Sequence, residues 1–286
     1  METIVIIDSG VESTNTDNVI GGISILLENE EVAIIEGEYK DDIGHGTAIY
    51  NIINDACEDV CFFIIKIFNH SFECDQRLLL QALLYVYENV NCNFIIISSG
   101  AIVFNNYSQI KSIISKLYND KGIIIVAAFN NEGALSYPAS DENVIGVDSS
   151  SVVSREADYY ILKGSPIDIL SREFSFRLKW KDGKKIIDKG NSYIAALFAS
   201  KIINAYKQLK TTDKNLLLDF IKHKNNVLHF NRQEFHEILY PKYLLSADRK
   251  LKAIAFPFSK EMGVIAANED LLKVDIVHYC DIRQSG

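Results

Sequence analysis

The sequence lacks the features that mark several large classes of protein. None of its apolar runs approaches the roughly 18 to 20 residues that a membrane-spanning helix requires. The net charge is −9, whereas nucleic-acid-binding domains carry a basic footprint. Only four prolines occur, and there is no repeat or low-complexity segment. We therefore expect a soluble globular protein without a membrane or nucleic-acid partner, whose long-range field favours neutral or basic ligands.

The cysteines and the N-terminus also lack a recognisable pattern. Cys57 and Cys61 are four residues apart, but no second close pair of Cys or His completes a zinc site. We predict that the five cysteines are reduced, mostly buried thiols and that the protein needs no metal or cofactor. The first ten residues, METIVIIDSG, have no basic region and only a four-residue apolar run, which predicts a first strand rather than a secretory signal. The predicted location is the cytoplasm.

What the sequence does contain is a regular alternation of strand and helix patterns. Short β-branched runs predict strands at 3–8, 61–67, 92–98, 122–128 and 143–148. Helical patterns lie near 46–55, 76–90, 106–119, 191–208 and 213–223. This alternation predicts an α/β fold with a doubly wound, mostly parallel sheet and helices on both faces.

Two later segments have a different character. FSFRLKWKDGKKII, residues 174–187, alternates around a central Asp-Gly and predicts a β-hairpin. The last 36 residues predict strand, helix, strand, like the start of a truncated Rossmann-like unit without the glycine motif of a nucleotide site. We divide the chain into a domain at 1–224 and a small α/β extension at 225–286, through which a partner or a further domain would bind. The terminal RQSG is typical of a turn into further chain.

Four polar residues stand where a parallel sheet exposes its ligand-binding edge. Asp8 ends a strand, His45 lies between two glycines at the start of a helix, Asn131 follows a strand, and Ser192 opens a helix in Gly-Asn-Ser. Each has an ordinary explanation alone, as a turn, a loop residue or a helix cap. Together they give an acid, a base and a nucleophile in the order Asp, His, Ser, at the edge where α/β proteins bind ligands.

These segments resemble the subtilisin-like serine proteases. The likeness rests on IVIIDSGV, DDIGHGTAIYNII, IIIVAAFNNEG and GNSYIAALFAS, supported by IISSG at 96–100 and SYPASDENVIGVDS at 136–149. It covers roughly residues 1–224. With no segment before the first strand, the sequence resembles an intracellular member of the family without signal or propeptide. The calcium sites of the family cannot be assigned from it.

The resemblance implies a role for each matching residue. Ser192 would be the nucleophile, His45 its general base and Asp8 the residue that orients the imidazole. Asn131 and the Ser192 main-chain N–H would form the oxyanion hole. The substrate-binding residues implied by the resemblance are Ser98, Ser99 and Gly100, which would pair with an extended peptide, and Ala128, Phe129 and Asn130, which would border the pocket before the cut bond. The alternative interpretation of Ser98 to Gly100 is a strand-to-loop turn with no role in substrate binding.

The sequence also departs from the family around these positions. Ala48, Asn191, Tyr193 and Ala196 replace the usual His, Thr, Met and Pro, although no reacting group is lost. Phe129 and Asn130 replace a small residue and a glycine, which predicts a narrower or more polar pocket. We therefore expect a selective processing endopeptidase, for example one that removes a leader from a precursor peptide.

Two other functions remain open from the sequence. A catalytically weak or inactive protein of the same fold would bind peptides or regulate a partner through its C-terminal segment, and the altered residues around the motifs favour this alternative. A small-molecule hydrolase with the same triad is disfavoured because the sequence has no Gly-x-Ser-x-Gly elbow.

Overall fold

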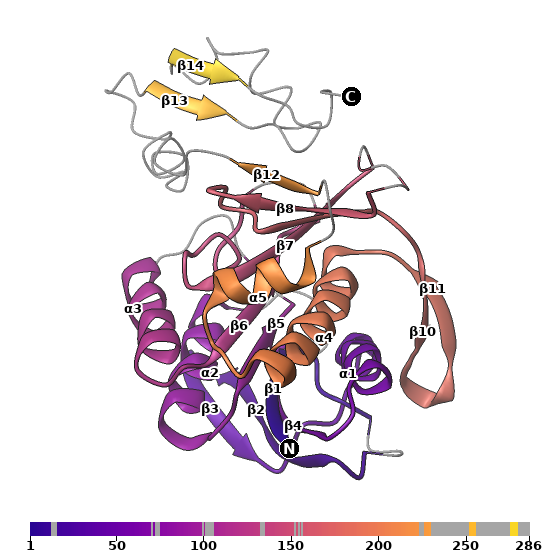
Figure 1. The fold of residues 1–286 in the computed structure, drawn as a ribbon. Coiled ribbons are helices and arrows are strands. Elements are labelled where there is room, and N and C mark those ends of the chain that lie inside the picture. The colour runs from indigo at the N-terminus through magenta and orange to yellow at the C-terminus, as the bar shows by residue number, and fades with distance from the viewer. Residues whose placement is uncertain are drawn as a thin grey trace.

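The centre of the protein is a large sheet with helices on both faces (Figure 1). The computed structural model describes residues 1–12, 16–69, 71, 75–98, 100, 106–131, 135–151, 153, 155, 157–222, 226–229, 252–255 and 275–279. The strands of the large sheet are β1 (Glu2–Asp8), β2 (Val19–Glu28), β3 (Glu31–Glu36), β4 (Val60–Lys66), β5 (Phe94–Ile97), β6 (Ile124–Ala128), β7 (Val144–Ser150), β8 (Tyr159–Lys163), β9 (Ile169–Arg172) and β12 (Val227–His229). Their order across the sheet is β12-β8-β9-β7-β6-β5-β1-β4-β2-β3.

The sheet is mostly parallel. Among the described strands of this large sheet, only the β2–β3 and β8–β9 pairs run antiparallel. Strands β1 and β5 to β7 are buried almost throughout and rich in Ile and Val, as strands covered on both faces must be. Strand β1 lies between β4 and β5, so the chain winds outward from β1 in both directions. A ligand-binding crevice forms at the carboxyl ends of strands at such a switch point. The predicted doubly wound α/β fold is confirmed.

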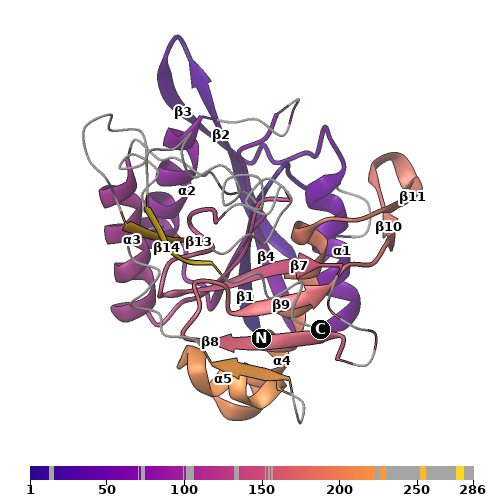
Figure 2. The ribbon, with the colours of Figure 1, turned by 90° about the horizontal axis from the view of Figure 1, so that it is seen from above.

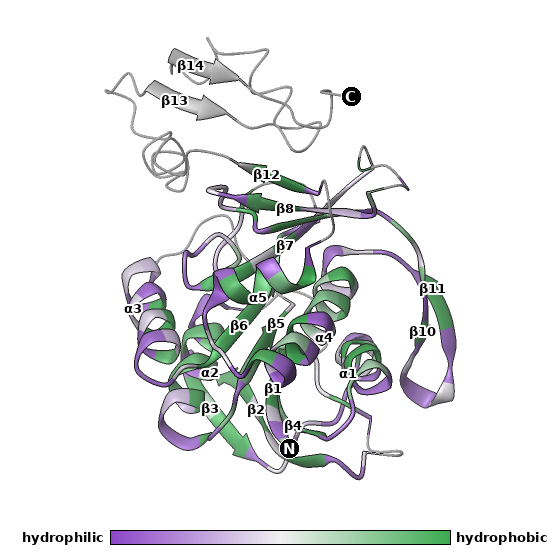
Figure 3. Cartoon of the chain, viewed as in Figure 1, coloured by the Kyte–Doolittle hydropathy of each residue, from purple (hydrophilic) through white to green (hydrophobic). Residues whose placement is uncertain are grey.

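In the described residues, five α-helices cover the two faces of the sheet. Helices α2 (Gln76–Asn89) and α3 (Tyr107–Asn119) lie on one face, and α1 (His45–Ala56), α4 (Asn191–Leu209) and α5 (Lys214–Ile221) lie on the other (Figures 1 and 2). Each group packs its apolar residues against the sheet as a separate cluster. The hydropathy colouring shows the apolar strands enclosed between more polar outer helix surfaces (Figure 3).

The predicted hairpin is present as a separate two-stranded unit beside α1. Strands β10 (Phe176–Lys179) and β11 (Lys185–Asp188) pair antiparallel. The turn between them places Asp182 and Gly183 at positive φ, 57° and 64°, a conformation that Asp and Gly tolerate well. Strand β11 leads directly into Gly190 and the start of α4.

The C-terminal part is described only in short segments. Strand β12 lies beyond the predicted domain boundary at 224 and pairs with β8 of the large sheet, while the domain division itself remains a prediction. Strands β13 (Lys252–Ala255) and β14 (Asp275–Tyr279) pair in parallel, an arrangement that a strand, helix, strand pattern gives, although the segment between them is outside the described residues. No helix in the described ranges has the length and apolar character to cross a membrane.

The described cysteines agree with their prediction. Cys57, Cys61 and Cys92 are buried and unpaired with one another. Burial raises the pKa of the Cys57 thiol to about 11 and that of Cys92 to about 12, so both stay protonated and unreactive at neutral pH. Cys74 and Cys280 lie outside the described residues.

Candidate active site

Asp8 and His45 form a buried pair at the carboxyl end of β1. Asp8 is fully buried. His45, the first residue of α1, is 8% exposed. Both carboxylate oxygens of Asp8 lie 2.9 Å from Nδ1 of His45. Because an ionised carboxylate only accepts hydrogen bonds, Nδ1 carries the proton and Nε2 is left as the basic nitrogen.

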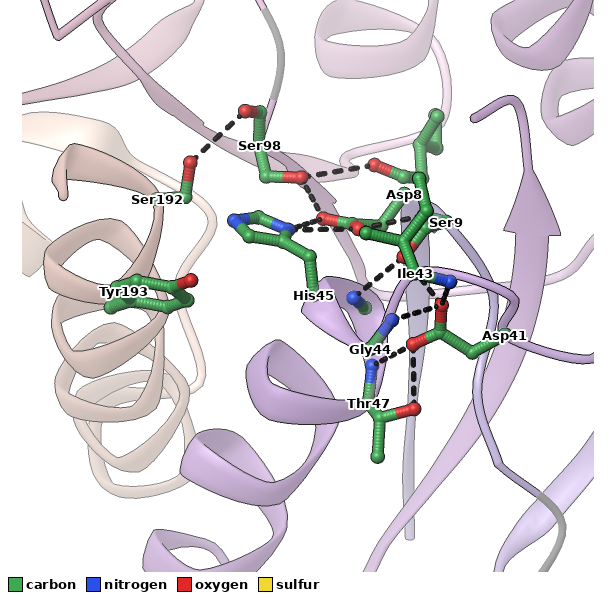
Figure 4. A network of polar contacts seen from close by, with 12 residues as sticks. Asp8, Ser9, Asp41, Ile43, Gly44, His45, Thr47, Ser98, Ser192 and Tyr193 are labelled. Carbon is green, nitrogen blue, oxygen red and sulfur yellow. Dashed lines mark hydrogen bonds and ion pairs between the residues drawn. The ribbon is translucent and has the colours of Figure 1, made fainter. Parts of the chain in front are cut away.

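Asp8 is itself held by two residues, each of which directly follows a strand. The main-chain N–H of Ser9 donates to Oδ1 at 2.6 Å. The Ser98 hydroxyl, just beyond the end of β5, donates to Oδ2 (Figure 4). These bonds satisfy a buried carboxylate and fix its orientation toward the imidazole.

Glycines allow α1 to approach the loop after β1. A β-carbon on Gly46 would lie 2.2 Å from the main-chain oxygen of Gly10, so only glycine fits in the first turn of the helix. Gly44, immediately before the helix, has φ 111°, which a side chain would strain. The packing around His45 therefore requires the two glycines of the Gly-His-Gly sequence, which is also one of the segments that resemble the family.

Asp41 is a part of the site that the sequence analysis missed. It is 2% exposed, and its Oδ1 accepts from the N–H groups of Ile43 and Gly44 at 2.9 and 2.7 Å and from the Ser9 hydroxyl at 2.8 Å. Its Oδ2 accepts from the N–H and hydroxyl of Thr47 at 2.9 and 2.6 Å. An acidic residue just before a helix start was the available signal.

The two members of the pair shift each other's pKa in opposite directions. For Asp8, burial favours the neutral form, but the charge and hydrogen bond of His45, with the donors Ser98 and Ser9, lower its pKa below the usual value. For His45, burial opposes the charged form, while the charge and hydrogen bond of Asp8, and the charges of Asp41 and Asp188, raise its pKa above 6.5. The pair is thus an ionised carboxylate beside a strengthened base.

Ser192 is the second residue of α4. The cap position of this helix is Gly190, which has no side chain, so Ser192 does not act as the cap residue that its position also allowed, and a helix N-terminus of this kind can receive an anion. The Ser192 hydroxyl donates to the main-chain oxygen of Ser98 at 3.1 Å. Figure 4 shows Ser192 on the side of the His45 ring that carries the outer nitrogen. The structure therefore brings Asp8, His45 and Ser192 together.

Asn131 lies beside the start of α4. Its Oδ1 accepts the main-chain N–H of Asn191 at 2.9 Å, and a β-carbon on Gly190 would lie 3.7 Å from its Nδ2. The side-chain amide is thus anchored by its oxygen against the segment that precedes Ser192. This arrangement can present Nδ2 as a donor near the nucleophile, as an oxyanion hole needs.

Asn191 occupies the position where the family usually has Thr, and the structure gives it a clear role. It is 3% exposed, and its Nδ2 donates to Asp148 Oδ1 at 2.8 Å and to the Asn130 main-chain oxygen at 3.0 Å. Its Oδ1 accepts from the Ser149 hydroxyl at 2.6 Å. This polar cluster joins β7 and the loop after β6 to the start of α4. Asp148 and Ser149 end the segment 136–149 that supports the family resemblance, but nothing in the sequence assigned them a role in the site.

The predicted substrate-binding residues fall into two groups. Ser98 contacts both Asp8 and Ser192, and a β-carbon on Gly100 would lie 3.0 Å from Ser136 Oγ; Ser99 lies outside the described residues. The side chains of Ala128 and Phe129 are 2% exposed and belong to the core, so any contact between these two residues and a substrate would use their main chain. Asn130 is partly exposed. Their roles in binding remain proposals.

The described residues contain no group of three or more His, Cys, Asp or Glu side chains arranged to hold a metal ion. The expectation that no cofactor is needed stays a prediction.

Comparison with known proteins identifies relatives of the same fold. No family model matches the sequence. The minor extracellular protease Epr of Bacillus subtilis (strain 168) is 24% identical over 168 residues, which are 54% of this chain and 24% of Epr. The chain thus spans about a quarter of that relative's length. Because Epr is named as extracellular, the predicted cytoplasmic location remains a prediction.

Two solved structures show the likeness over most of the chain. The epidermin leader peptide processing serine protease EpiP of Staphylococcus aureus has a TM-score of 0.62 and 18% identity, covering 82% of this chain and 75% of its own. The nisin leader peptidase NisP of Lactococcus lactis has a TM-score of 0.62 and 16% identity, covering 83% of this chain and 86% of its own. The chain therefore has the fold of the subtilisin-like serine proteases.

Proposed function

We propose that this protein is a serine endopeptidase that cuts peptide bonds through an acyl-enzyme. The observation that carries the proposal is the paired contact of both Asp8 oxygens with His45 Nδ1 at 2.9 Å, beside Ser192 in the first turn of α4. A buried carboxylate that fixes the tautomer of a histidine next to a serine has the chemistry of nucleophilic acyl transfer.

The reaction begins with a turn of the Ser192 hydroxyl. Its hydrogen bond to the Ser98 main-chain oxygen breaks, and the hydroxyl donates to Nε2 of His45 instead. His45 takes the proton while Oγ forms a bond to the peptide carbonyl carbon. The resulting imidazolium faces the ionised Asp8, and it then gives its proton to the leaving amine as the carbon–nitrogen bond breaks. A water molecule repeats the sequence on the ester and releases the acid.

The oxyanion of the tetrahedral intermediate requires donors on the other side of the carbonyl. The Asn131 Nδ2 and the Ser192 main-chain N–H fill this role in the proposal. The start of α4 adds the partial positive charge of a helix N-terminus. Because Asn131 is anchored through its oxygen by Asn191, its donor is positioned before the substrate arrives, which is what makes such a donor effective.

We further propose that the substrate is a precursor peptide and that cleavage is selective. EpiP and NisP, by their names, act on leader peptides. The polar cluster of Asn191, Asp148 and Ser149 contacts, through Asn191, the main chain of the segment that would border the pocket, which supports a more polar pocket. A cleavage profile on a peptide library tests this: we expect a few permitted residues before the cut bond, and broad acceptance of large apolar residues contradicts it.

The activity itself is tested with a fluorophosphonate probe, which reacts with an activated serine. We expect labelling of the intact protein and its loss in Ser192→Ala. The matched control is Ser200→Ala, which makes the same change on the same helix, where the Ser200 hydroxyl donates to the Leu197 main-chain oxygen. This control should label like the parent. Absence of labelling in the intact, folded protein contradicts the proposal.

A second candidate function is peptide binding without efficient catalysis. The observation that favours it is the hydrogen bond from the Ser192 hydroxyl to Ser98, which occupies the proton that His45 has to remove. Under this alternative, peptide substrates bind with the same affinity to the parent and to Ser192→Ala, and neither turns over. Isothermal titration with peptides from the same library, together with a turnover assay, distinguishes the two functions: binding without turnover by the folded parent supports the alternative.

A further inference from the structure

Tyr193, which follows the nucleophile, contacts the catalytic base. Its side chain is 3% exposed, and its ring centroid lies 5.0 Å from that of His45 with a 41° angle between the planes. Figure 4 shows the phenol ring alongside the imidazole, on the helix that carries Ser192. The family usually has Met at this position, so the aromatic contact with the base is a feature of this chain.

The hydroxyl of Tyr193 reaches a second carboxylate. It donates to Asp188 Oδ2 at 2.9 Å, and Asp188 is the last residue of β11. Burial, and then the hydrogen bond and charge of Asp188, raise the pKa of Tyr193 far above its usual value. The phenol therefore stays protonated and serves Asp188 only as a donor, which ties the carboxylate to the ring that contacts His45.

The hairpin that carries Asp188 is fastened to the helix that carries His45. The Trp180 side chain packs on Gly44, where a β-carbon would lie 2.2 Å from Nε1 of the indole. Lys179 Nζ pairs with Asp55 of α1 at 2.7 Å. The main-chain N–H of Asp182 donates to Glu12, in the loop after β1, at 3.0 Å. These contacts hold the hairpin and the base in one unit, so Asp188 keeps its place relative to the imidazole.

We propose that Tyr193 and Asp188 are a positioning pair for His45, in which the phenol ring limits the imidazole's rotation and the Asp188 carboxylate stabilises the imidazolium. This inference rests on the proposed function, because the imidazolium forms only when His45 acts as a base. The inference gives Tyr193, which stands where the family usually has Met, a specific role. Its ring contacts His45, and its hydroxyl donates to Asp188 of the β10–β11 hairpin.

The charges around His45 show why Asp188 can act in this way. Three carboxylates contribute to its environment, from β1, from the loop before α1 and from β11: Asp8, Asp41 and Asp188. Asp8 is engaged with Nδ1, and Asp41 is already satisfied by Ser9 and the first turn of α1. Asp188 is the one whose orientation depends on a residue adjacent to the nucleophile. Its negative charge favours the protonated imidazole and so raises the pKa of His45.

The test is the pH dependence of kcat/KM with a peptide substrate, for the parent, Asp188→Asn, Tyr193→Phe and the double variant. Removal of the Asp188 charge lowers the pKa of His45, so the neutral base persists to lower pH. We expect the acid limb of Asp188→Asn to move down by roughly 0.5 pH units, the size typical of a partly exposed charge pair. Its plateau should fall roughly 3- to 10-fold, the effect of one lost hydrogen-bonded partner.

The other variants separate positioning from a structural role. Tyr193→Phe keeps the ring against His45 and should shift the acid limb in the same direction by less, while the double variant should shift no more than Asp188→Asn, because both act through one hydrogen bond. The matched control, Asp182→Asn, removes the same charge from the turn of the same hairpin, where Asp182 pairs with Lys184 at 3.6 Å. It should leave the acid limb at the parent value.

The results distinguish failure of this inference from failure of the proposed function. If the parent reacts with the fluorophosphonate probe but Asp188→Asn leaves the acid limb unmoved, the inference is wrong and the function stands. An equal shift in Asp182→Asn also overturns the inference, since net charge would then explain it. If the folded parent shows neither labelling nor turnover, the proposed function fails and the inference fails with it. Thermal unfolding of each variant establishes that the protein compared is folded.

Discussion

The base half and the nucleophile half of the candidate site are built differently. Asp8 and His45 lie inside the protein, where the sheet and the first turn of α1 enclose them, and Asp41 and Ser98 add buried hydrogen bonds. Ser192 is partly exposed and Asn131 is exposed, and both are positioned at the start of α4. Folding therefore completes the base half, whereas in the proposed mechanism the nucleophile half still requires a rotation of the Ser192 hydroxyl when substrate arrives.

The difference follows from the cost of burying charge. A buried carboxylate is tolerated only when hydrogen bonds replace its hydration, so Asp8 and Asp41 must be satisfied for the domain to fold at all. A serine hydroxyl and an amide carry no net charge and can remain at the surface at little cost. Substitutions in the base half should therefore affect both stability and catalysis, whereas those in the nucleophile half should affect catalysis alone.

The largest effect on rate is expected from Asp8→Asn. An amide that donates toward His45 stabilises the wrong tautomer, so the Nε2 lone pair is no longer directed at Ser192, and kcat should fall by about 10⁴-fold. The measurement is single-substrate kinetics with Asp120→Asn as control, a change at the exposed end of α3. Activity within tenfold of the parent would mean that the buried contact with His45 is not part of catalysis.

A smaller but still large effect is expected from Asn131→Ala. Loss of the proposed oxyanion donor should lower kcat by about 10²- to 10³-fold with little change in KM, because the donor acts mainly in the transition state. The melting temperature should fall only slightly, since the side chain is exposed and water can replace its hydrogen bond to the Asn191 N–H. Asn119→Ala, at the exposed end of α3, is the control. A large loss of stability in Asn131→Ala would contradict the contrast between the two halves.

Of these three substitutions, Asp41→Asn should have the smallest effect on rate and the largest effect on stability. The amide group replaces one acceptor, so at least one of the buried N–H donors of Ile43, Gly44 and Thr47 loses its partner. This should cost about 1–3 kcal/mol of unfolding free energy and lower kcat/KM roughly tenfold through displacement of His45. Chemical denaturation and kinetics measure the two effects. Unchanged stability would show that the base half does not depend on this carboxylate.

Sequence patterns predicted most of the layers that support the site. The apolar spacing of Ile110, Ile113, Ile114 and Leu117 identified α3, and all four side chains are buried. The Asp-Gly between β10 and β11 identified the hairpin. In contrast, β2 and β3 were not predicted. Gly21 and Gly22 interrupt the alternation of β2, and the turn uses Asn29 and Glu30 at φ 51° and 70° without a glycine.

The parts of the site that escaped prediction are those whose role depends on contacts between distant segments. Asp41 binds Ser9 across 32 positions of sequence, and Asp148 binds Asn191 across 43. Both carboxylates lie within segments that resemble the family, but nothing in those segments shows which residues they bind. Their burial, and the donors that surround them, exist only after the strands have aligned.

By itself, the sequence determined the order of the reacting groups and the alternating elements that bring them to one edge of the sheet. Strand ends and helix starts are local events that a short run of residues specifies. The tertiary structure alone decided how each group is held: Ser98 shared between Asp8 and Ser192, Asp41 beneath the first turn of α1, and Tyr193 between His45 and Asp188. The physical reason is that a hydrogen bond is directional and effective only over a few ångströms, and such distances between remote residues are set by packing.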